Sequence, residues 1–250
     1  MYNPYSLQGK VILVTGASSG IGQSVAIECS KMGATVVVTG RNQNRLQETF
    51  DMLEGPGHIQ IPADLSDYSE IQKLVEFCPK VDGVSHNAGI AKIIPVKFIS
   101  PETLEEIVGT NAFGPILLTQ LLVRKKKINS NGSIVFTSSL SGVYCVHFGE
   151  SMYAASKGAI SGFAKGAALE LSAQGIRVNC VNPSIIQTNI FKNEGDIISD
   201  EQMQEKIKNY PLKRLGVTTD VSWAHVFFLS DASTWITGVD LPIDGGYILI

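Results

Sequence analysis

Two side chains that can exchange protons lie four residues apart, at Tyr153 and Lys157, so a helix there would place both on one face. A free tyrosine has a pKa of about 10, which is too high for easy proton exchange at neutral pH. A neighbouring positive charge stabilises the phenolate and lowers that pKa, and Lys157 could supply the charge. The spacing predicts a phenol that passes a proton to or from an oxygen atom.

A serine shortly before this helix could complete such a site. Ser139 ends an apolar run, where its hydroxyl could hydrogen-bond a carbonyl oxygen and stabilise charge developing on it. Both features also have ordinary interpretations, because an exposed tyrosine and lysine at this spacing are common and serines at 138–142 are typical of a turn. The catalytic interpretation therefore depends on the rest of the sequence.

A glycine pattern near the start of the chain favours a nucleotide-binding turn. Gly16, Gly20 and Gly22 follow an apolar run at 11–14 with the spacing TGxxxGxG, which indicates a strand, a tight turn and a helix N-terminus. Glycine allows close backbone approach, and the first amides of a helix are unpaired at the positive end of its dipole. A diphosphate could bind there, although a plain turn before a buried helix would look similar.

Short β-rich runs alternate with helical patterns along the chain, which predicts an α/β, doubly wound Rossmann fold with a mostly parallel seven-stranded sheet and helices on both faces. The expected strands are 11–15, 35–39, 58–61, 83–86, 133–137, 177–181 and 240–243. Ligands of such sheets bind beyond the carboxyl ends of the strands. The segments expected to converge there are 16–22, 40–41, 64, 87–89, 138–139 and 182–183.

A helix expected from about Ser151 to Gln174 carries Gly158, Gly162 and Gly166 at four-residue spacing. A glycine inside a helix costs up to about 1 kcal/mol relative to alanine, so three in one stripe suggest that another backbone packs closely there. That backbone could belong to the same subunit or to a partner, so we expect a homodimer or homotetramer.

Composition indicates one domain over residues 1–250 and excludes several classes of partner. The net charge of −3 and the pI of about 5.8 give no basic field for nucleic acid. The polar first ten residues lack a signal-peptide core, and no uninterrupted apolar run reaches a membrane span of roughly 18 residues. The four cysteines and four histidines are scattered, so we expect no metal site and no disulfide framework, in a cytoplasmic protein.

Together, the ordered motifs resemble the short-chain dehydrogenases/reductases of the single-domain type with about 250 residues, especially members like the 3-oxoacyl-acyl-carrier-protein reductases. The resemblance spans essentially the whole chain. It is carried by the glycine pattern, Asn87-Ala88-Gly89, Asn111, the Ser139, Tyr153 and Lys157 set, and Asp244-Gly245-Gly246.

The resemblance implies a nicotinamide-dependent oxidoreductase that interconverts a ketone and a secondary alcohol. Tyr153 would act as general acid or base, Ser139 would position the oxygen, Lys157 would lower the tyrosine pKa and hold the nicotinamide ribose, and Asn111 would support a water. Asn87 and Asn111 could instead be structural. The cofactor-binding residues that it implies are Gly16, Ser18, Ser19, Gly20, Ile21, Gly22, Arg41, Asp64, Leu65, Asn87, Ala88, Gly89, Tyr153, Lys157, Pro183, Ile186 and Thr188.

The sequence departs from the family pattern in four places. The segment from Asp64 to Asn87 is about a turn shorter, and the loop from Ser139 to Tyr153 is one residue longer. Ser184 stands where glycine is customary, and His86 where asparagine is common. We expect the longer loop to line the substrate pocket with Tyr144, Cys145, His147 and Phe148.

Cofactor choice depends on the end of the second strand. Enzymes that prefer NAD usually have an acidic side chain there for the ribose 2′-hydroxyl, and this chain has Gly40. Arg41 could pair with a 2′-phosphate, helped by Ser18 or Asn42, so NADP(H) is favoured over NAD(H). A solvated Arg41 and use of either cofactor is the alternative.

The substrate is left open between two classes. We expect a lid at about 189–215 over a small carbonyl or alcohol substrate. The basic run at 124–127 could dock an acyl carrier protein, but it also suits a solvated helix end, and Gln174 stands where such reductases often carry arginine. A sugar, polyol or other small ketone remains an alternative substrate, and a non-catalytic nucleotide-binding regulator remains an alternative function.

Overall fold

The computed structural model describes residues 2–188, 205 and 207–250, and its centre is one sheet of seven parallel strands in the order β3-β2-β1-β4-β5-β6-β7. This confirms the predicted doubly wound Rossmann class. The strands are β1 (Val11–Thr15), β2 (Thr35–Thr39), β3 (Ile59–Gln60), β4 (Val81–His86), β5 (Ile128–Thr137), β6 (Arg177–Pro183) and β7 (Asp240–Ile243).

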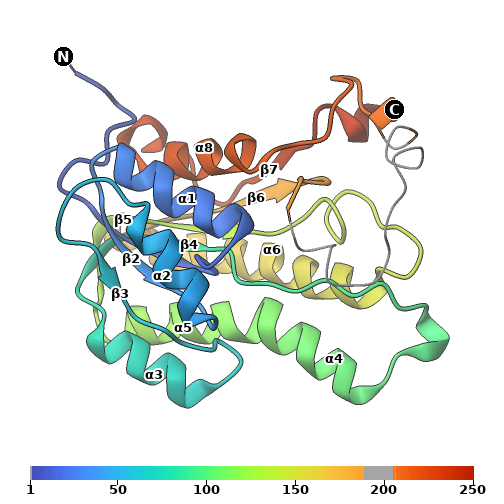
Figure 1. The fold of residues 1–250 in the computed structure, drawn as a ribbon, viewed down its shortest axis with the longest axis horizontal. Helices are drawn as coiled ribbons and strands as arrows, with labels where there is room; N and C mark the ends of the chain where they lie inside the picture. Colours follow the sequence, from blue (N-terminus) through green and yellow to red (C-terminus); the bar gives the residue numbers. More distant parts are fainter. Residues whose placement is uncertain (1, 189–204, 206) are drawn as a thin grey trace.

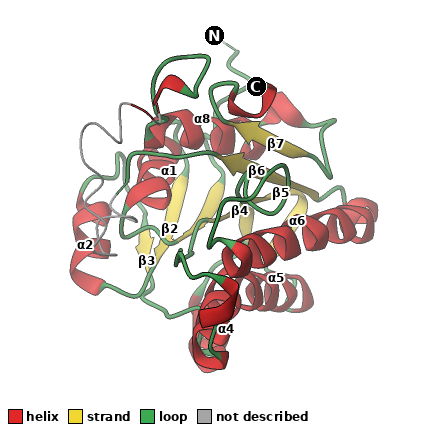
Figure 2. Cartoon of the chain, turned by 90° about the vertical axis from the view of Figure 1, so that its right-hand side faces the viewer, coloured by secondary structure: helices red, strands yellow, loops and turns green. Residues whose placement is uncertain are grey.

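Helices cover both faces of the sheet (Figures 1 and 2). The helices are α1 (Gly20–Lys31), α2 (Gln43–Asp51), α3 (Tyr68–Phe77), α4 (Pro101–Val108), α5 (Gly114–Arg124), α6 (Ser151–Leu171) and α8 (Thr218–Leu229). Side chains of a strand alternate between faces, so Ile12 and Val14 join a buried cluster with α1 and α8, while Leu13 joins the cluster with α3, α5 and α6.

The largest difference from the predicted strands is at β5, which begins at Ile128, five residues earlier than expected. The polar cluster at 129–132 falls within these bounds as an irregularity of the strand: the pairing with β4 passes from Val81–Ile128 directly to Gly83–Ser133, and Asn131 has φ of +63°. Asn129 donates from Nδ2 to Asp82 Oδ1 at 2.8 Å, and Oδ2 of the same carboxylate accepts from the Val11 amide at 2.8 Å. Side-chain hydrogen bonds therefore hold this polar segment at the amino-terminal ends of β1, β4 and β5, opposite to the ends where ligands are expected.

The helices α4 and α5 form one continuous stretch through a π-helical turn, Gly109–Phe113, which contains buried Asn111. Such turns are frequent at functional sites. The stretch Pro101–Arg124 is long and apolar enough to cross a membrane, with a mean hydropathy of 1.3. However, 56% of its apolar window is buried inside the fold.

The glycine stripe of α6 is only partly explained within this subunit. A side chain at Gly158 would meet the Gly142 carbonyl oxygen at 3.0 Å, as the close-packing prediction requires. At Gly162 and Gly166, a Cβ would meet no described atom within 4 Å.

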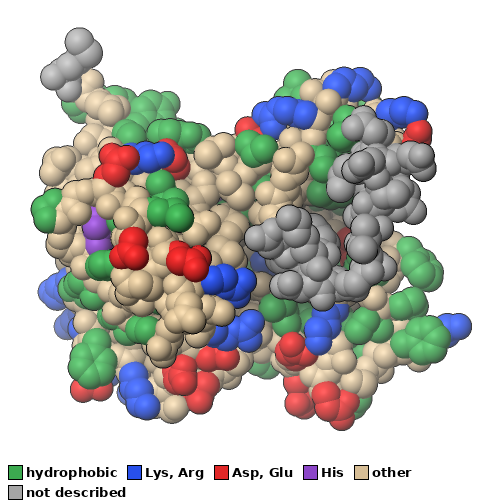
Figure 3. Space-filling view, viewed as in Figure 1, with side chains coloured by type: hydrophobic (Ala, Val, Ile, Leu, Met, Phe, Trp, Pro, Cys, Tyr) green, Lys and Arg blue, Asp and Glu red, His purple; other side chains and the backbone are tan. Residues whose placement is uncertain are grey.

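Both signs of charge are interspersed over the face shown in Figure 3, in line with the small net charge.

The C-terminal end of α8 is held by a buried arginine of β6. Arg177 is 8% exposed, and its guanidinium donates to the Phe228 carbonyl at 2.6 Å, the Ser230 carbonyl at 3.3 Å and Ser233 Oγ at 2.9 Å. Carbonyls at a helix C-terminus lack helical partners and carry the negative end of the dipole. A fixed cation there therefore ties α8 to the sheet.

Replacing Arg177 by methionine keeps apolar bulk but removes these hydrogen bonds, so we expect the free energy of unfolding to fall by about 2–4 kcal/mol. Urea titration followed by circular dichroism measures it. Arg45→Met, on the exposed face of α2, is the matched control and should change stability by less than about 0.5 kcal/mol. Equal effects of the two substitutions would contradict the role of Arg177.

Candidate active site

The structure brings together the four residues predicted to do chemistry. Ser139 follows β5, Tyr153 and Lys157 lie in the first two turns of α6, and Asn111 lies in the π-helical turn. A hydrogen bond joins Ser139 to Tyr153, and Lys157 Nζ lies 5.8 Å from the tyrosine ring centroid. The lysine ammonium donates to the Thr137 carbonyl oxygen at 2.8 Å. The phenol, the ammonium and the hydroxyl thus converge at the end of β5.

Burial sets the proton affinities of this site. It raises the pKa of Tyr153 to about 12, an effect that nearby Glu150 increases and the Ser139 hydrogen bond opposes. Burial also lowers the pKa of Lys157 to about 8. Burial dominates the pKa of Tyr153 here, and Lys157 is not among the groups that shift it, so the lowering of the tyrosine pKa by Lys157 stays a prediction. At neutral pH the phenol holds its proton and the lysine is mostly charged.

Asn111 joins the loop after β4 to α6. Its Oδ1 accepts from the Ile90 amide at 2.8 Å, and its Nδ2 donates to the Ile90 carbonyl at 2.9 Å and to Ser156 Oγ at 3.0 Å. A side chain at Gly89 would lie 3.3 Å from Asn111 Oδ1 and 3.4 Å from Lys157 Nζ. These contacts match the structural interpretation of Asn111, and its support of a water stays a prediction.

The glycine turn between β1 and α1 forms a cradle that side chains would fill. Gly16 has φ of +63°, and a Cβ there would lie 2.7 Å from the Ala88 amide nitrogen. At Gly22 a Cβ would lie 2.3 Å from the Gly16 carbonyl oxygen. In the described chain no side chain caps α1 at Ser19, so its first amides keep their capacity to donate. This cradle fits the diphosphate of a dinucleotide.

The adenosine side of the cradle carries the residues expected to select the cofactor. A Cβ at Gly40 would lie 3.2 Å from Ser18 Oγ, so these residues adjoin. Arg41 is exposed, and its Nη1 lies 3.8 Å from Asp64 Oδ2. Asp64 Oδ1 also accepts from the amide and hydroxyl of Ser66 at 2.9 and 2.7 Å. Arg41 can therefore bind an anion by giving up only its weak, exposed ion pair with Asp64.

The residues predicted for the nicotinamide side of the cradle differ in how they could contact a cofactor. A Cβ at Gly20 would lie 3.5 Å from Thr188 Cγ2, and the Leu140 amide donates to the Pro183 carbonyl at 3.1 Å, so the segment after β6 does adjoin the cradle. In contrast, the side chains of Leu65 and Ile186 are only 6% exposed and pack in the core. Their predicted contact with a cofactor would have to come from the backbone.

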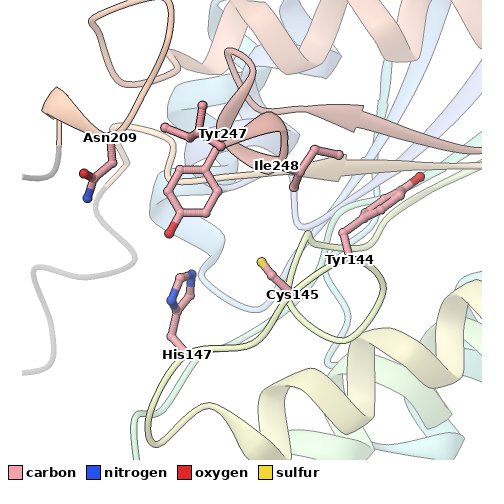
Figure 4. A pocket seen from close by; sticks show the side chains of 7 residues that line it. Tyr144, Cys145, His147, Asn209, Tyr247 and Ile248 are labelled. Atoms are coloured by element: carbon pink, nitrogen blue, oxygen red, sulfur yellow. The ribbon is translucent and has the colours of Figure 1, made fainter.

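A cavity of about 530 Å³ opens beside the loop that follows Ser139 (Figure 4). Its ring-bearing side chains include His147 and Tyr247, whose ring centroids are 6.0 Å apart. Of the four pocket residues predicted from the loop, Phe148 does not line it and is 87% exposed. The sequence analysis missed the C-terminal part of the wall. The lining residues are Tyr144, Cys145, His147, Asn209, Tyr247, Ile248 and Ile250.

Two departures from the family pattern now have structural roles. Ser184 Oγ hydrogen-bonds Tyr210 OH at 2.7 Å, a contact that glycine could not make, and the Tyr210 ring lies 5.1 Å from that of Tyr247. His86 is buried, stacks on Phe136 and shares a hydrogen bond with Thr119. Of the predicted lid at 189–215, residues 189–204 and 206 lie outside the described residues.

This geometry, a dinucleotide cradle beside a tyrosine, lysine and serine set, defines a nicotinamide-type oxidoreductase site. A family model described as enoyl-(acyl carrier protein) reductase matches residues 16–248, and the chain belongs to the short-chain dehydrogenase/reductase family. The resemblance inferred from the sequence is therefore confirmed.

Relatives at about one-third identity span nearly the whole chain. A 3-oxoacyl-(acyl-carrier-protein) reductase of Rickettsia felis is 30% identical over 244 residues, which cover 98% of this chain and 99% of the relative. Versicolorin reductase of Emericella nidulans is 34% identical over 257 residues, 97% of each chain.

Solved structures agree with the fold. A putative short-chain alcohol dehydrogenase from Sinorhizobium meliloti matches with a TM-score of 0.91 at 30% identity over 99% of both chains. A putative 2-deoxy-D-gluconate 3-dehydrogenase from Agrobacterium tumefaciens, with bound NADP, matches with a TM-score of 0.89 at 27% identity over 100% of both.

Keeping Lys157 charged at neutral pH lowers the stability of the folded protein. The pKa of Lys157 is about 8 in the folded state, whereas the ordinary value of 10.5 applies in the unfolded state. Below pH 8 Lys157 is protonated in both the folded and the unfolded state, so the loss of stability is complete there. This loss disappears as the pH rises to 10.5. We expect Lys157→Met to raise the free energy of unfolding at pH 7 by about 1–2 kcal/mol. Denaturant titrations at pH 7 and 10.5 measure this gain, which should shrink at the higher pH; a less stable variant at pH 7 would contradict it.

Proposed function

We propose that the protein is an NADP(H)-dependent ketone reductase in which Tyr153 supplies the proton. The observation that carries this proposal is the convergence of Ser139, Tyr153 and Lys157 at the end of β5, where Ser139 and Lys157 are buried and Tyr153 is partly buried. Members of its family reduce ketones, and the dinucleotide cradle adjoins this cluster through Gly89. When bound, the cofactor supplies or accepts the hydride.

Each side chain has a defined task in this proposal. Ser139 Oγ accepts from the Ser141 amide at 3.1 Å, which leaves its own hydrogen for the tyrosine or for a substrate oxygen. Tyr153, protonated at neutral pH, gives its proton to that oxygen as the carbonyl becomes an alcohol. Lys157 stabilises the resulting phenolate while charged, so reduction should weaken as the pH rises through about 8.

For the substrate we propose a 3-oxoacyl thioester, with acyl carrier protein as the partner that presents it. The cavity beside the active-site loop combines apolar Ile248 and Ile250 with the rings of His147 and Tyr247, which suits an uncharged acyl chain. The exposed basic residues at 124–126 could meet an acidic carrier. Similarity to 3-oxoacyl-(acyl-carrier-protein) reductases supports this choice. The resemblance to a putative 2-deoxy-D-gluconate 3-dehydrogenase favours a sugar or polyol as the alternative.

The test is NADPH oxidation with acetoacetyl thioester, followed by absorbance, in wild type and Tyr153→Phe. Loss of the general acid should lower kcat by about 10²–10⁴-fold while NADPH still binds. Tyr68→Phe is the matched control, because this exposed phenol at the start of α3 lies outside both the cavity and the catalytic set. Unchanged turnover in Tyr153→Phe would contradict the mechanism, and binding of NADPH without turnover of any ketone would favour a regulator.

Cofactor preference is tested at Arg41. Removing its guanidinium in Arg41→Ala should weaken NADPH binding by about 10–100-fold and leave NADH binding nearly unchanged, since only NADPH carries the 2′-phosphate. Fluorescence titration with both nucleotides measures it, and Arg45→Ala, on the exposed part of α2, is the control. Equal weakening of both nucleotides would contradict a phosphate-binding role for Arg41.

A further inference from the structure

Four side chains, of which Ser85 and His225 are buried and Asn87 and Thr137 are partly buried, form a closed ring of hydrogen bonds under the cradle. His225 of α8 pairs through Nδ1 with Ser85 Oγ of β4 at 2.9 Å and through Nε2 with Thr137 Oγ1 of β5 at 2.9 Å. Asn87 closes the ring, because its Nδ2 lies 2.9 Å from Ser85 Oγ and its Oδ1 lies 2.7 Å from Thr137 Oγ1. The ring thus joins two strand ends, the loop after β4 and a helix.

The hydrogen bonds of this ring allow only one assignment of donors and acceptors. Asn87 Nδ2 also donates to the Ser85 carbonyl at 3.1 Å, and a carbonyl only accepts, so the amide orientation is fixed. Asn87 Oδ1 must then accept the Thr137 hydroxyl hydrogen, and Thr137 Oγ1 must accept from His225 Nε2–H. His225 Nδ1 consequently accepts from Ser85. A neutral imidazole with its proton on Nε2 satisfies every link.

The surroundings keep the imidazole in that form. His225 and Ser85 are 0% exposed, and burial lowers the pKa of His225 to about 3. His86 lies near it, and its pKa is also lowered to about 3 by burial and by His225 itself. Both imidazoles are therefore neutral at neutral pH, so the ring is a fixed support that does not titrate there.

The ring is connected to both halves of the active site. A Cβ at Gly16 would lie 2.9 Å from the Asn87 carbonyl carbon, so the backbone of the ring residue Asn87 forms one wall of the cradle. On the other side, the carbonyl of the ring residue Thr137 accepts the Lys157 ammonium at 2.8 Å. Any shift of Asn87 or Thr137 would therefore move the cradle or the catalytic lysine.

We propose that His225 is a positioning residue, which acts as a neutral, single-tautomer bridge that sets Asn87 against the cofactor cradle and Thr137 under Lys157. This inference rests on the proposed function for its kinetic consequences. An apolar residue would fill the same space on α8, but it would leave Ser85 and Thr137 without the donor and acceptor that the two ring nitrogens supply. Its partners lie 140 and 88 residues away in the chain, on separate strands.

The first experiment needs no substrate. Proton–nitrogen correlation spectra of protein labelled with ¹⁵N-histidine, with the signal assigned by its loss in His225→Leu, should show a neutral imidazole protonated at Nε2 from pH 8 down to pH 5. A signal protonated at Nδ1, or titration of His225 above pH 5, would overturn the proposal even if the protein turned over no ketone at all.

The second experiment separates positioning from stability. We expect His225→Leu to weaken NADPH binding about tenfold, to lower kcat at least tenfold, and to move the alkaline loss of activity to lower pH, because Lys157 loses a well-placed acceptor. His225→Gln, which keeps a donor and an acceptor, should recover part of both losses. Arg177→Met is the control, since it loosens α8 without touching the ring.

The comparison has two outcomes that would overturn the proposal. One is a His225→Leu protein with wild-type NADPH affinity and an unmoved pH profile. The other is an Arg177→Met protein that, at an equal loss of thermal stability, shows the same kinetic losses as His225→Leu. If the wild type turns over no ketone, the proposed function fails by itself, and NADPH affinity together with the tautomer still decides the role of His225.

Discussion

The close approach of β1 and β4 at their carboxyl ends is the constraint on which the rest of the site depends. The Gly16 turn and the Asn87–Ala88 backbone share a space in which a Cβ would lie within 2.7 Å of a backbone nitrogen. Only glycine fits there, and its φ of +63° sends the chain over the sheet edge into α1. The same contact forms the cradle wall and brings Gly89 beside Asn111 and Lys157, so binding and chemistry share one point of close packing.

Around that point the protein buries polar groups that are expensive to bury. Lys157 is 5% exposed and Ser139 is 8% exposed, and both are supported by hydrogen bonds from strand ends and the following loop. Arg177 similarly satisfies carbonyls at the end of α8. A polar network whose members are all paired holds its atoms in one arrangement, which is what a site that transfers a proton requires.

The sequence predicted most of the fold because the strands are short β-branched runs, and β1, β2 and β7 have the bounds expected. At β5 the start was missed, because Ile128 pairs with Val81 before the turn-like cluster at 129–132 interrupts the ladder, while the pairing from Ser133 onward was expected. The catalytic set was recognisable because Tyr153 and Lys157 are local neighbours on a helix. The direction of the Tyr153 pKa shift was not, because burial is set by residues far away in the chain. His225 gave no local signal, since all its partners come from β4 and β5.

The cavity wall and the catalytic set come from different kinds of segment. Ser139, Tyr153 and Lys157 are held by the end of β5 and by α6, whereas the wall is built from the loop at 144–147, Asn209 and the C-terminal residues 247–250. Substitutions in the wall can therefore change which molecule fits without disturbing the strand ends that hold the reacting groups. Such a separation lets a lineage exchange substrates by drift in its loops while the chemistry is inherited intact.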